Sequence, residues 1–233
     1  MTEERNVAVE EKTYCVVISD DQETLLAARA AGRVPVGLLG EKDLSAARYL
    51  IETMDAADEQ FLERVVRREL GLPWIIGESD RLILREFTME DLTQIPQEPG
   101  DQDADRVFYT PDSLEAYIRG QYGFFEYGLW AVVRKEDGRI VGKAGVVGAE
   151  ENPLKLELGY HIFLPYRRRG YAQEACRMIL DYVTETYECP VYAVTEDANR
   201  ASRCLLEKLG FEIMTQKYNG SEPGRCRYEW CCL

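Results

Sequence analysis

The sequence lacks closely spaced cysteine pairs and long apolar stretches, and it is poor in histidine. Its 233 residues include one histidine, His161, and seven cysteines, none of them in a Cys-x-x-Cys pair. Structural zinc sites usually draw their ligands from closely spaced pairs of cysteines and histidines, so the sequence predicts no metal site. No run of 18 apolar residues is present, which argues against a membrane-spanning helix. The first residues, Met-Thr-Glu-Glu-Arg, lack the apolar core of a signal peptide, so we expect a cytoplasmic protein with reduced cysteines.

Basic residues are also scarce. Lysine and arginine number 28 against 42 aspartates and glutamates, which gives a net charge of −14. Nucleic acids are bound by clustered positive charge, so we expect no nucleic-acid partner. An acidic surface attracts cations instead, which is compatible with a cationic substrate. The apolar share of 45% is sufficient for a folded core, and the length allows one large or two small domains.

Residues 1–78 predict a small parallel α/β unit. Residues 1–12 are polar and charged, which predicts a frayed end, and Gly77-Glu-Ser79 predicts a short joint to the rest of the chain. Strand and helix patterns alternate between them, with strand 13–19, helix 23–31, strand 34–39, a helical patch from 43 to 50, and helix 58–70.

This unit resembles the last motif of haloacid-dehalogenase-like phosphatases. The likeness is carried by Ile18-Ser-Asp-Asp-Gln-Glu-Thr, by Gly32, and by the Val-Pro-Val-Gly-Leu run that follows. In that family the aspartate that matches Asp20 helps to hold magnesium. The nucleophile strand Asp-x-Asp-Gly is missing here, and Thr24 stands where a further acid is often found. We therefore expect a structural or regulatory fragment rather than a phosphatase, because no aspartyl-phosphate can form.

Residues 79–233 predict a second domain of strands and helices. Asp137-Gly138 predicts a hairpin between strands 129–134 and 140–147, and Thr88-Met-Glu-Asp91 has the form of a capping box. The remaining predicted segments are strands 81–87, 155–163, 191–195, 211–218 and 225–231, helices 114–122 and 198–209, and a loop from 94 to 111.

The stretch from Leu156 to Ala172 predicts a strand, a turn and the start of a helix. Apolar residues recur with helical spacing from Ala172 to Val183, so the helix begins near Gly170. Helix starts leave N–H groups that favour anions, and Gly170 allows a ligand to approach the backbone closely. Three arginines, Arg167 to Arg169, add donors suited to phosphate. The stretch predicts a diphosphate pocket, with a capped helix and a solvated basic turn as the alternative.

Three motifs in this domain resemble the GCN5-related N-acetyltransferases. Arg167-x-x-Gly170-x-Ala172 is similar to their Arg/Gln-x-x-Gly-x-Gly/Ala signature. Glu157-Leu-Gly-Tyr160, and Asn199-x-x-Ser202 followed by Glu207-Lys-Leu-Gly-Phe211, resemble the branch that acetylates N-termini of ribosomal proteins and various amines. The resemblance covers residues from about 80 to 233. It implies an α/β fold with a mixed, mostly antiparallel, splayed sheet, acetyl-CoA as cosubstrate, and direct acetyl transfer to a primary amine.

The resemblance also implies which residues contact the coenzyme. The pantetheine arm would pair with the strand end, where backbone N–H groups near Ile162 would polarise the thioester oxygen. The diphosphate would sit on the loop of the signature, residues Arg167 to Ala172, which we call the signature loop. Asn199 would contact the pantetheine arm or the acceptor, with a helix cap as the alternative role. The implied contacts are His161, Ile162, Phe163, Leu164, Arg167, Arg168, Arg169, Gly170, Tyr171, Ala172 and Asn199.

Glu157 and Ser202 are the predicted catalytic residues. Glu157 lies in an otherwise apolar strand, where burial would raise its pKa toward that of a general base, although it could instead be a structural partner of an arginine. Ser202 is the hypothetical acid for the departing thiolate. Many relatives use a tyrosine for this step, but Leu206 occupies that position here, and Cys204 is a weaker candidate.

The resemblance also implies that the acceptor pocket is shaped by the loop after the first strand of the domain and by the aromatic residues before the second strand. Tyr109, Phe124 and Tyr127 are the predicted acceptor contacts, with Phe125 and Asp101, Asp103 and Asp105 near them. Acids among aromatics suit a cationic amine, although a solvated loop would explain the same residues. The identity of the acceptor and assembly as a homodimer stay open. The alternatives are a non-catalytic acyl-CoA-binding module whose N-terminal unit recruits a partner, and a magnesium phosphatase.

Overall fold

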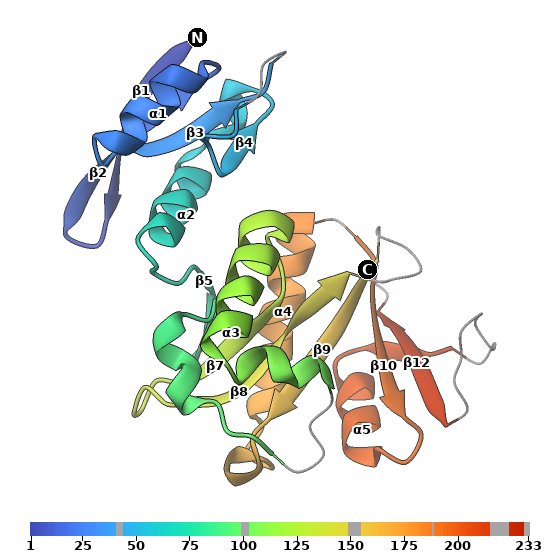
Figure 1. Ribbon diagram of the computed structural model, residues 1–233. Coiled ribbons are helices and arrows are strands. Elements are labelled where there is room, and N and C mark those ends of the chain that lie inside the picture. Colours follow the sequence, from blue (N-terminus) through green and yellow to red (C-terminus); the bar gives the residue numbers. More distant parts are fainter. Residues whose placement is uncertain (41–43, 99–102, 149–154, 188, 215–223, 231–233) are drawn as a thin grey trace. The chain divides into compact units, whose positions relative to one another are not determined.

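The computed structural model describes residues 1–40, 44–98, 103–148, 155–187, 189–214 and 224–230. The chain divides into two compact units, Met1–Trp74 and Ile75–Leu233 (Figure 1). None of the helices that lie in the described ranges is long and apolar enough to cross a membrane.

The first unit contains a four-stranded sheet, in the order β1-β2-β3-β4, within its described residues. Strands β2, β3 and β4 are parallel, and β1 is antiparallel to β2. Asp21 caps α1 and Asp58 caps α2 through their side chains, as expected for helix starts. The elements are β1 (Thr2–Val9), β2 (Lys12–Ser19), α1 (Gln22–Ala30), β3 (Val34–Leu38), β4 (Tyr49–Ile51), η1 (Met54–Ala56) and α2 (Glu59–Glu69).

Two predictions for this unit are wrong. The polar start of the chain is not frayed, because β1 pairs along its whole length with β2 and turns back at Glu10, whose φ is +56°. Val7 and Val9 are buried on alternate positions, while the polar residues of this edge strand face solvent. The helical patch predicted at 43–50 is replaced from Tyr49 by β4, in which Tyr49 and Ile51 are buried with the period of a strand.

The second unit is built on an eight-stranded sheet, in the order β11-β12-β10-β9-β8-β7-β6-β5, as far as the structure is described. All neighbouring strands are antiparallel except β9 and β10. The strands are β5 (Ile75–Glu78), β6 (Leu82–Arg85), β7 (Leu129–Arg134), β8 (Ile140–Gly148), β9 (Leu156–Ile162), β10 (Val191–Glu196), β11 (Phe211–Ile213) and β12 (Arg225–Trp230). This mixed α/β architecture with a mostly antiparallel sheet confirms the predicted fold class.

The parallel strands β9 and β10 separate along the sheet. Their described residues pair at Leu156 with Val191 and at Glu157 with Tyr192, and no further pair follows. The C-terminal half of β9, from Leu158 onward, therefore has β8 on one side and a gap on the other. This gap is the splayed edge that the sequence resemblance implies.

Helices and turns cover this sheet. Helix α4 (Tyr171–Tyr187) packs against β5, β6, β8 and β9, and α5 (Arg200–Lys208) packs against β10 and β11 (Figure 1). The helix predicted at 114–122 is longer, because α3 (Pro111–Tyr117) continues into the π-helix η4 (Ile118–Phe125). Short helical turns make up the rest, namely η2 (Met89–Gln94), η3 (Asp103–Phe108) and η5 (Leu164–Tyr166).

The predicted joint at Gly77–Ser79 is also wrong. Gly77 and Glu78 belong to the edge strand β5, which pairs with β6. A Cβ atom built on Gly77 would lie 3.3 Å from the Cβ of Met178, so the glycine allows α4 to pack tightly on this strand. The final predicted strand pair is shorter than expected at its first member, which ends at Ile213, and residues 215–223 lie outside the described ranges.

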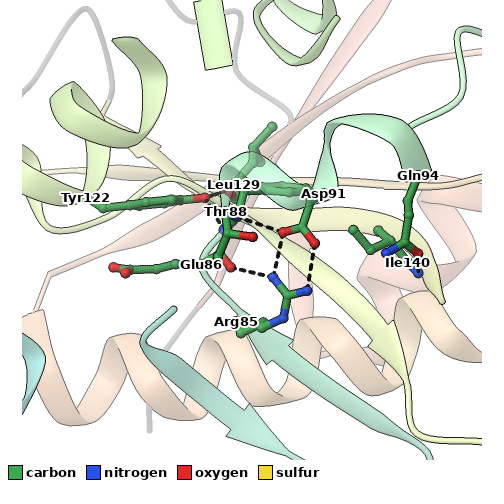
Figure 2. Close-up of polar contacts among 9 residues, drawn as sticks. Arg85, Glu86, Thr88, Asp91, Gln94, Tyr122, Leu129 and Ile140 are labelled. Atoms are coloured by element: carbon green, nitrogen blue, oxygen red, sulfur yellow. Dashed lines mark hydrogen bonds and ion pairs between the residues drawn. The ribbon is translucent and has the colours of Figure 1, made fainter. Parts of the chain in front are cut away.

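A buried polar cluster fixes the turn after β6 (Figure 2). The guanidinium of Arg85 donates to both carboxylate oxygens of Asp91, at 2.7 and 2.8 Å, and to the carbonyl of Glu86. The N–H of Thr88 donates to the same carboxylate, which completes the predicted capping box. The hydroxyl of Tyr122 donates to the carbonyl of Leu129. Because the Asp91 side chain is only 3% exposed, this turn depends on Arg85 for charge balance.

Candidate active site

Two cavities meet beside the gap between β9 and β10. We call the first the loop cavity, because it lies between the signature loop, the start of α4 and one face of α5; its volume is about 770 Å³. The second, the strand cavity, has a volume of about 450 Å³ and is lined by β9, β10 and their neighbours. Four residues line both cavities, namely Tyr160, His161, Asn199 and Ser202. A ligand that fills both would bend around these four side chains.

The signature loop presents unpaired backbone donors to the loop cavity. Arg168 and Gly170 have positive φ angles, +65° and +83°, so the chain turns sharply before α4. In the described part of the chain, the backbone N–H groups from Arg168 to Gln173 have no acceptor. Such a group of amides at the start of a 17-residue helix is suited to a phosphate.

The loop cavity is positively charged in a chain that is strongly negative overall. Its lining includes Arg167, Arg168, Arg200 and Lys208 and no aspartate or glutamate, whereas the whole chain carries −14. Arg200 and Lys208 were not predicted as site residues. They lie eight positions apart on α5 with Cys204 midway. This spacing of four places all three residues on one side of a helix, and it could have indicated them. This charge suits a polyanion with several phosphates.

The loop cavity collects most but not all of the predicted coenzyme residues. His161, Ile162, Arg167, Arg168, Gly170, Tyr171, Ala172 and Asn199 line it. Phe163 and Leu164 instead line a separate cavity of about 490 Å³ with Glu98 and Tyr166. The guanidinium of Arg169 donates to the carbonyl of Pro165 at 3.2 Å and lies outside the lining.

The backbone at the end of β9 has one open side. The N–H of Phe163 donates to Val141 of β8 at 3.0 Å, and the N–H of Leu164 donates to the carboxylate of Glu98 at 2.6 Å. Because antiparallel bonding alternates along a strand, the N–H of Ile162 points away from β8 and toward the gap. The carbonyl of Ile162 accepts from the guanidinium of Arg167 at 2.7 Å. Of the predicted backbone donors, Ile162 is therefore the one positioned for the gap.

Ser202 and Tyr160 form a hydroxyl pair at the shared boundary of the cavities. Their oxygens lie 2.7 Å apart, and burial raises the pKa of Tyr160 to about 12 even though Ser202 hydrogen-bonds to it. The phenol therefore keeps its proton throughout the neutral range. The Asn199 side chain accepts a hydrogen bond from the N–H of Ser202, so it caps α5, which is the alternative role predicted for this residue. Tyr160 was not predicted as a site side chain, although it belongs to the quoted motif Glu157-Leu-Gly-Tyr160.

Glu157 lines the strand cavity but not the loop cavity. Its Oε2 accepts from the hydroxyl of Tyr192 at 3.0 Å, and the side chain is half-buried. The other charged residues of this lining are Lys143, Glu196 and Arg225. Opposite charges are balanced here, in contrast to the loop cavity.

The predicted acceptor residues do not line either cavity. Phe124 is 78% exposed, and Tyr127 packs against Tyr187 at the far end of α4 from the signature loop. Tyr109 is half-buried beside η3. Asp101 lies outside the described residues, as do the side chains of Asp103 and Asp105. No group of three or more His, Cys, Asp or Glu side chains that could hold a metal ion is found in the ranges that the structure describes.

Arg81 holds the signature loop from behind. Its guanidinium donates to the Glu174 carboxylate and, at 3.1 Å, to the carbonyl of Arg169, and it lies over the ring of Tyr171. Burial would raise the pKa of Glu174, but hydrogen bonds from Ser79 and Arg81 outweigh it and lower that pKa. This clamp was not predicted, because its members are about 90 residues apart in the sequence.

Comparisons with known proteins agree with this geometry. The sequence profile described as "Acetyltransferase (GNAT) domain" matches residues 81–212, more than half of the chain. Two Bacillus subtilis (strain 168) proteins are similar over shorter stretches. One is an uncharacterized protein, YkkB, 36% identical over 84 residues (35% of this chain, 49% of YkkB). The other is an uncharacterized N-acetyltransferase, YjdG, 31% identical over 86 residues (36% of this chain, 51% of YjdG). The chain thus spans about half the length of these curated relatives.

Solved structures share the fold of the second unit. An acetyltransferase from Agrobacterium tumefaciens has a TM-score of 0.53 at 21% identity and covers 67% of this chain and 94% of its own. A putative GnaT-family acetyltransferase from Bordetella pertussis reaches 0.54 at 21% identity, covering 66% and 98%. A ribosomal-protein-S5-alanine acetyltransferase from Vibrio fischeri reaches 0.53 at 17% identity, covering 66% and 94%.

The profile match begins at residue 81, so the N-terminal unit lies outside it. These comparisons give no support to the predicted resemblance of that unit to haloacid-dehalogenase-like phosphatases. In the structure, Asp20, which would match the magnesium-holding aspartate of those enzymes, forms an ion pair with the amino group of Met1. For the rest, the signature loop, the splayed strands and the profile match lead to one conclusion: the chain belongs to the GNAT family of acetyltransferases.

Proposed function

We propose that the protein transfers an acetyl group from acetyl-CoA to a primary amine, by direct attack while both are bound. The observation that carries this proposal is the pair of cavities that share Tyr160, His161, Asn199 and Ser202. The loop cavity, with its unpaired amides and cationic lining, suits the phosphates of the coenzyme. The strand cavity, with carboxylates of its own, suits an amine.

The residues of the loop cavity fit the coenzyme in charge and in hydrogen bonding. The loop amides would hold the diphosphate, and Arg168, Arg200 and Lys208 would supply positive charge around it. Arg167 has a second role, because its guanidinium holds the carbonyl of Ile162 and thereby fixes the strand end. The N–H of Ile162 would then face the thioester oxygen as its charge develops.

The chemistry would take place at the shared boundary. As the C–S bond breaks, Ser202 would give its proton to the sulfur and regain one from Tyr160, its partner at 2.7 Å, and the Tyr160 phenol would at once recover a proton from solvent. This pair would take the place of the tyrosine that many relatives carry where Leu206 stands, which is fully buried here. Glu157, in the strand cavity, would take the first proton of the incoming ammonium group, directly or through water.

Calorimetric titration with acetyl-CoA, followed by a thiol-release assay over a panel of amines, tests this function. We expect binding, and thiol release that depends on the amine. A panel of peptides with free N-termini, polyamines, amino sugars and small metabolites covers the acceptors that remain open. Binding without release for any amine would favour the non-catalytic acyl-CoA module. Absence of binding would overturn the proposal.

The Arg81 clamp gives a second prediction. Arg81→Ala removes the donor that holds the carbonyl of Arg169, so the signature loop loses its support without losing any group that faces the cavity. We expect a loss of about 1 kcal/mol, or about fivefold in the Kd for acetyl-CoA. Isothermal titration calorimetry measures this change.

Arg177→Ala is the matched control for that change. Arg177 is an exposed arginine on α4, the helix that carries Glu174, and no hydrogen bond of its side chain is found among the described residues. It removes the same charge from the same region and should leave the affinity unchanged. Equal affinities for Arg81→Ala and the wild type would show that the loop holds its shape unaided.

A further inference from the structure

His161 is joined to a buried carboxylate while it faces both cavities. Its Nε2 lies 2.7 Å from Oε2 of Glu98, whose side chain is 7% exposed. The same carboxylate accepts from the N–H of Leu164 and lies 3.4 Å from the guanidinium of Arg167. Glu98 is 63 residues away in the sequence, so no motif could have indicated the pair. A carboxylate held in this way fixes the orientation of the imidazole.

The chemistry of the pair determines which ring nitrogen is available. Nε2 of His161 has two neighbours, Oε2 of Glu98 at 2.7 Å and a guanidinium nitrogen of Arg167 at 3.2 Å. The carboxylate only accepts and the guanidinium only donates, and the shorter contact, to Glu98, assigns the proton to Nε2. The other nitrogen, Nδ1, then carries the lone pair. In the described part of the chain Nδ1 has no hydrogen-bond partner, and the side chain is 28% exposed. The imidazole is therefore arranged as a proton acceptor beside both cavities.

Position favours His161 over Glu157 for the proton lost during attack. The reacting nitrogen and the thioester carbon must meet where the cavities adjoin, and His161 lines both, whereas Glu157 lines the strand cavity alone. The two side chains are four residues apart on one face of β9, or about 13 Å. Glu157 lies at the end where β9 still pairs with β10, and His161 lies at the open end.

We propose that His161 is a catalytic base of this enzyme and that Glu98 is its positioning residue. The inference rests on the proposed function and assigns a further residue to it. The nitrogen–carbon bond forms as the carbon–sulfur bond breaks, and the electron pair of that bond leaves with the sulfur. Nδ1 takes the proton that the attacking nitrogen loses, while the sulfur gains one through Ser202. Glu98 stabilises the imidazolium as it forms, and solvent then removes the proton.

Chemical rescue tests the proposal in the full-length protein. We expect His161→Ala to lower the rate of acetylated-amine formation about 10²- to 10⁴-fold, the usual contribution of a general base. Added imidazole should restore part of the rate in a saturable manner, because it can occupy the space of the missing ring. Tetramethylammonium chloride at equal ionic strength should not. The product to quantify is the acetylated amine, since imidazole itself could accept an acetyl group.

Glu98→Gln is the second variant. It keeps an oxygen that accepts from Nε2 but loses the charge, so we expect a lower kcat that imidazole does not rescue. Thermal unfolding and acetyl-CoA titration of both variants separate a lost base from a lost fold or a lost cosubstrate site. The role of His161 would be overturned if His161→Ala kept the full rate. It would also be overturned if this variant folded and bound acetyl-CoA but was not rescued by imidazole. Neither result would affect the proposed function. A wild-type protein that acetylates no amine would overturn the proposed function and this role with it.

Discussion

Gly170→Val is expected to abolish acetyl-CoA binding at concentrations at which the wild type is saturated. Gly170 has a φ of +83°, a conformation that costs a side chain about 1–2 kcal/mol. A Cβ built there would also lie 3.4 Å from Nη2 of Arg81, so valine would press on the residue that holds the loop and displace the amides that would face the diphosphate. Losing even two charge-assisted hydrogen bonds, at about 1.5 kcal/mol each, weakens binding about 100-fold. Calorimetry or a fluorescence titration with acetyl-CoA provides the measurement.

The chain contains a matched control for the backbone strain in this variant. Gly138 has a similar φ of +68°, and a Cβ built there has no neighbour within 4 Å. It lies in the turn between β7 and β8 and lines neither the loop nor the strand cavity. Gly138→Val should therefore lose similar stability and keep its affinity for acetyl-CoA. If the two variants bind equally well, the signature loop does not carry the diphosphate.

Arg85→Ala is expected to cause a large loss of stability in the second unit. It leaves the Asp91 carboxylate, 3% exposed, without its bidentate partner (Figure 2). Removing one member of a buried ion pair costs about 3–5 kcal/mol, since the remaining charge stays desolvated. For a domain of this size the melting temperature should fall by about 10 °C. Urea unfolding followed by circular dichroism measures the free-energy change.

Two further variants show whether burial is the cause. Lys135→Ala breaks an exposed ion pair in which the Lys135 side chain is 34% exposed and the Glu78 side chain 47%. Its loss should lower the free energy of unfolding by less than about 1 kcal/mol. The double variant Arg85→Met with Asp91→Leu removes both charges and should be more stable than Arg85→Ala. Similar losses for Arg85→Ala and Lys135→Ala would contradict the account of this cluster.

Local sequence patterns predicted most of the helices and strands. The period of the apolar residues predicted α2, α4 and β7 to β10, because in these elements one face is buried and the other is not. Strand β1 escaped prediction because it is an edge strand with mostly polar, exposed residues. Strand β5 escaped because Gly77 reads as a break, whereas its actual role is to admit the Met178 side chain.

The site was predictable where a motif is contiguous and not where contacts join distant segments. The signature loop could be predicted, because Gly170 and the following helix are adjacent in sequence. The Glu98–His161 pair and the Arg81 clamp could not, because each depends on how the strands are ordered in the sheet. Phe124 and Tyr127 were predicted because they precede the second strand of the implied fold, and position in the sequence does not indicate which end of α4 they approach.

The positive lining of the loop cavity has a consequence for turnover. The charges of this lining suit phosphate groups, and free CoA carries the same phosphates as acetyl-CoA. If the cavity binds the coenzyme as proposed, it would retain the product about as firmly as the substrate, and the two would compete for one site. Acetyl transfer would then slow as CoA accumulates, so its rate would follow the ratio of acetyl-CoA to free CoA.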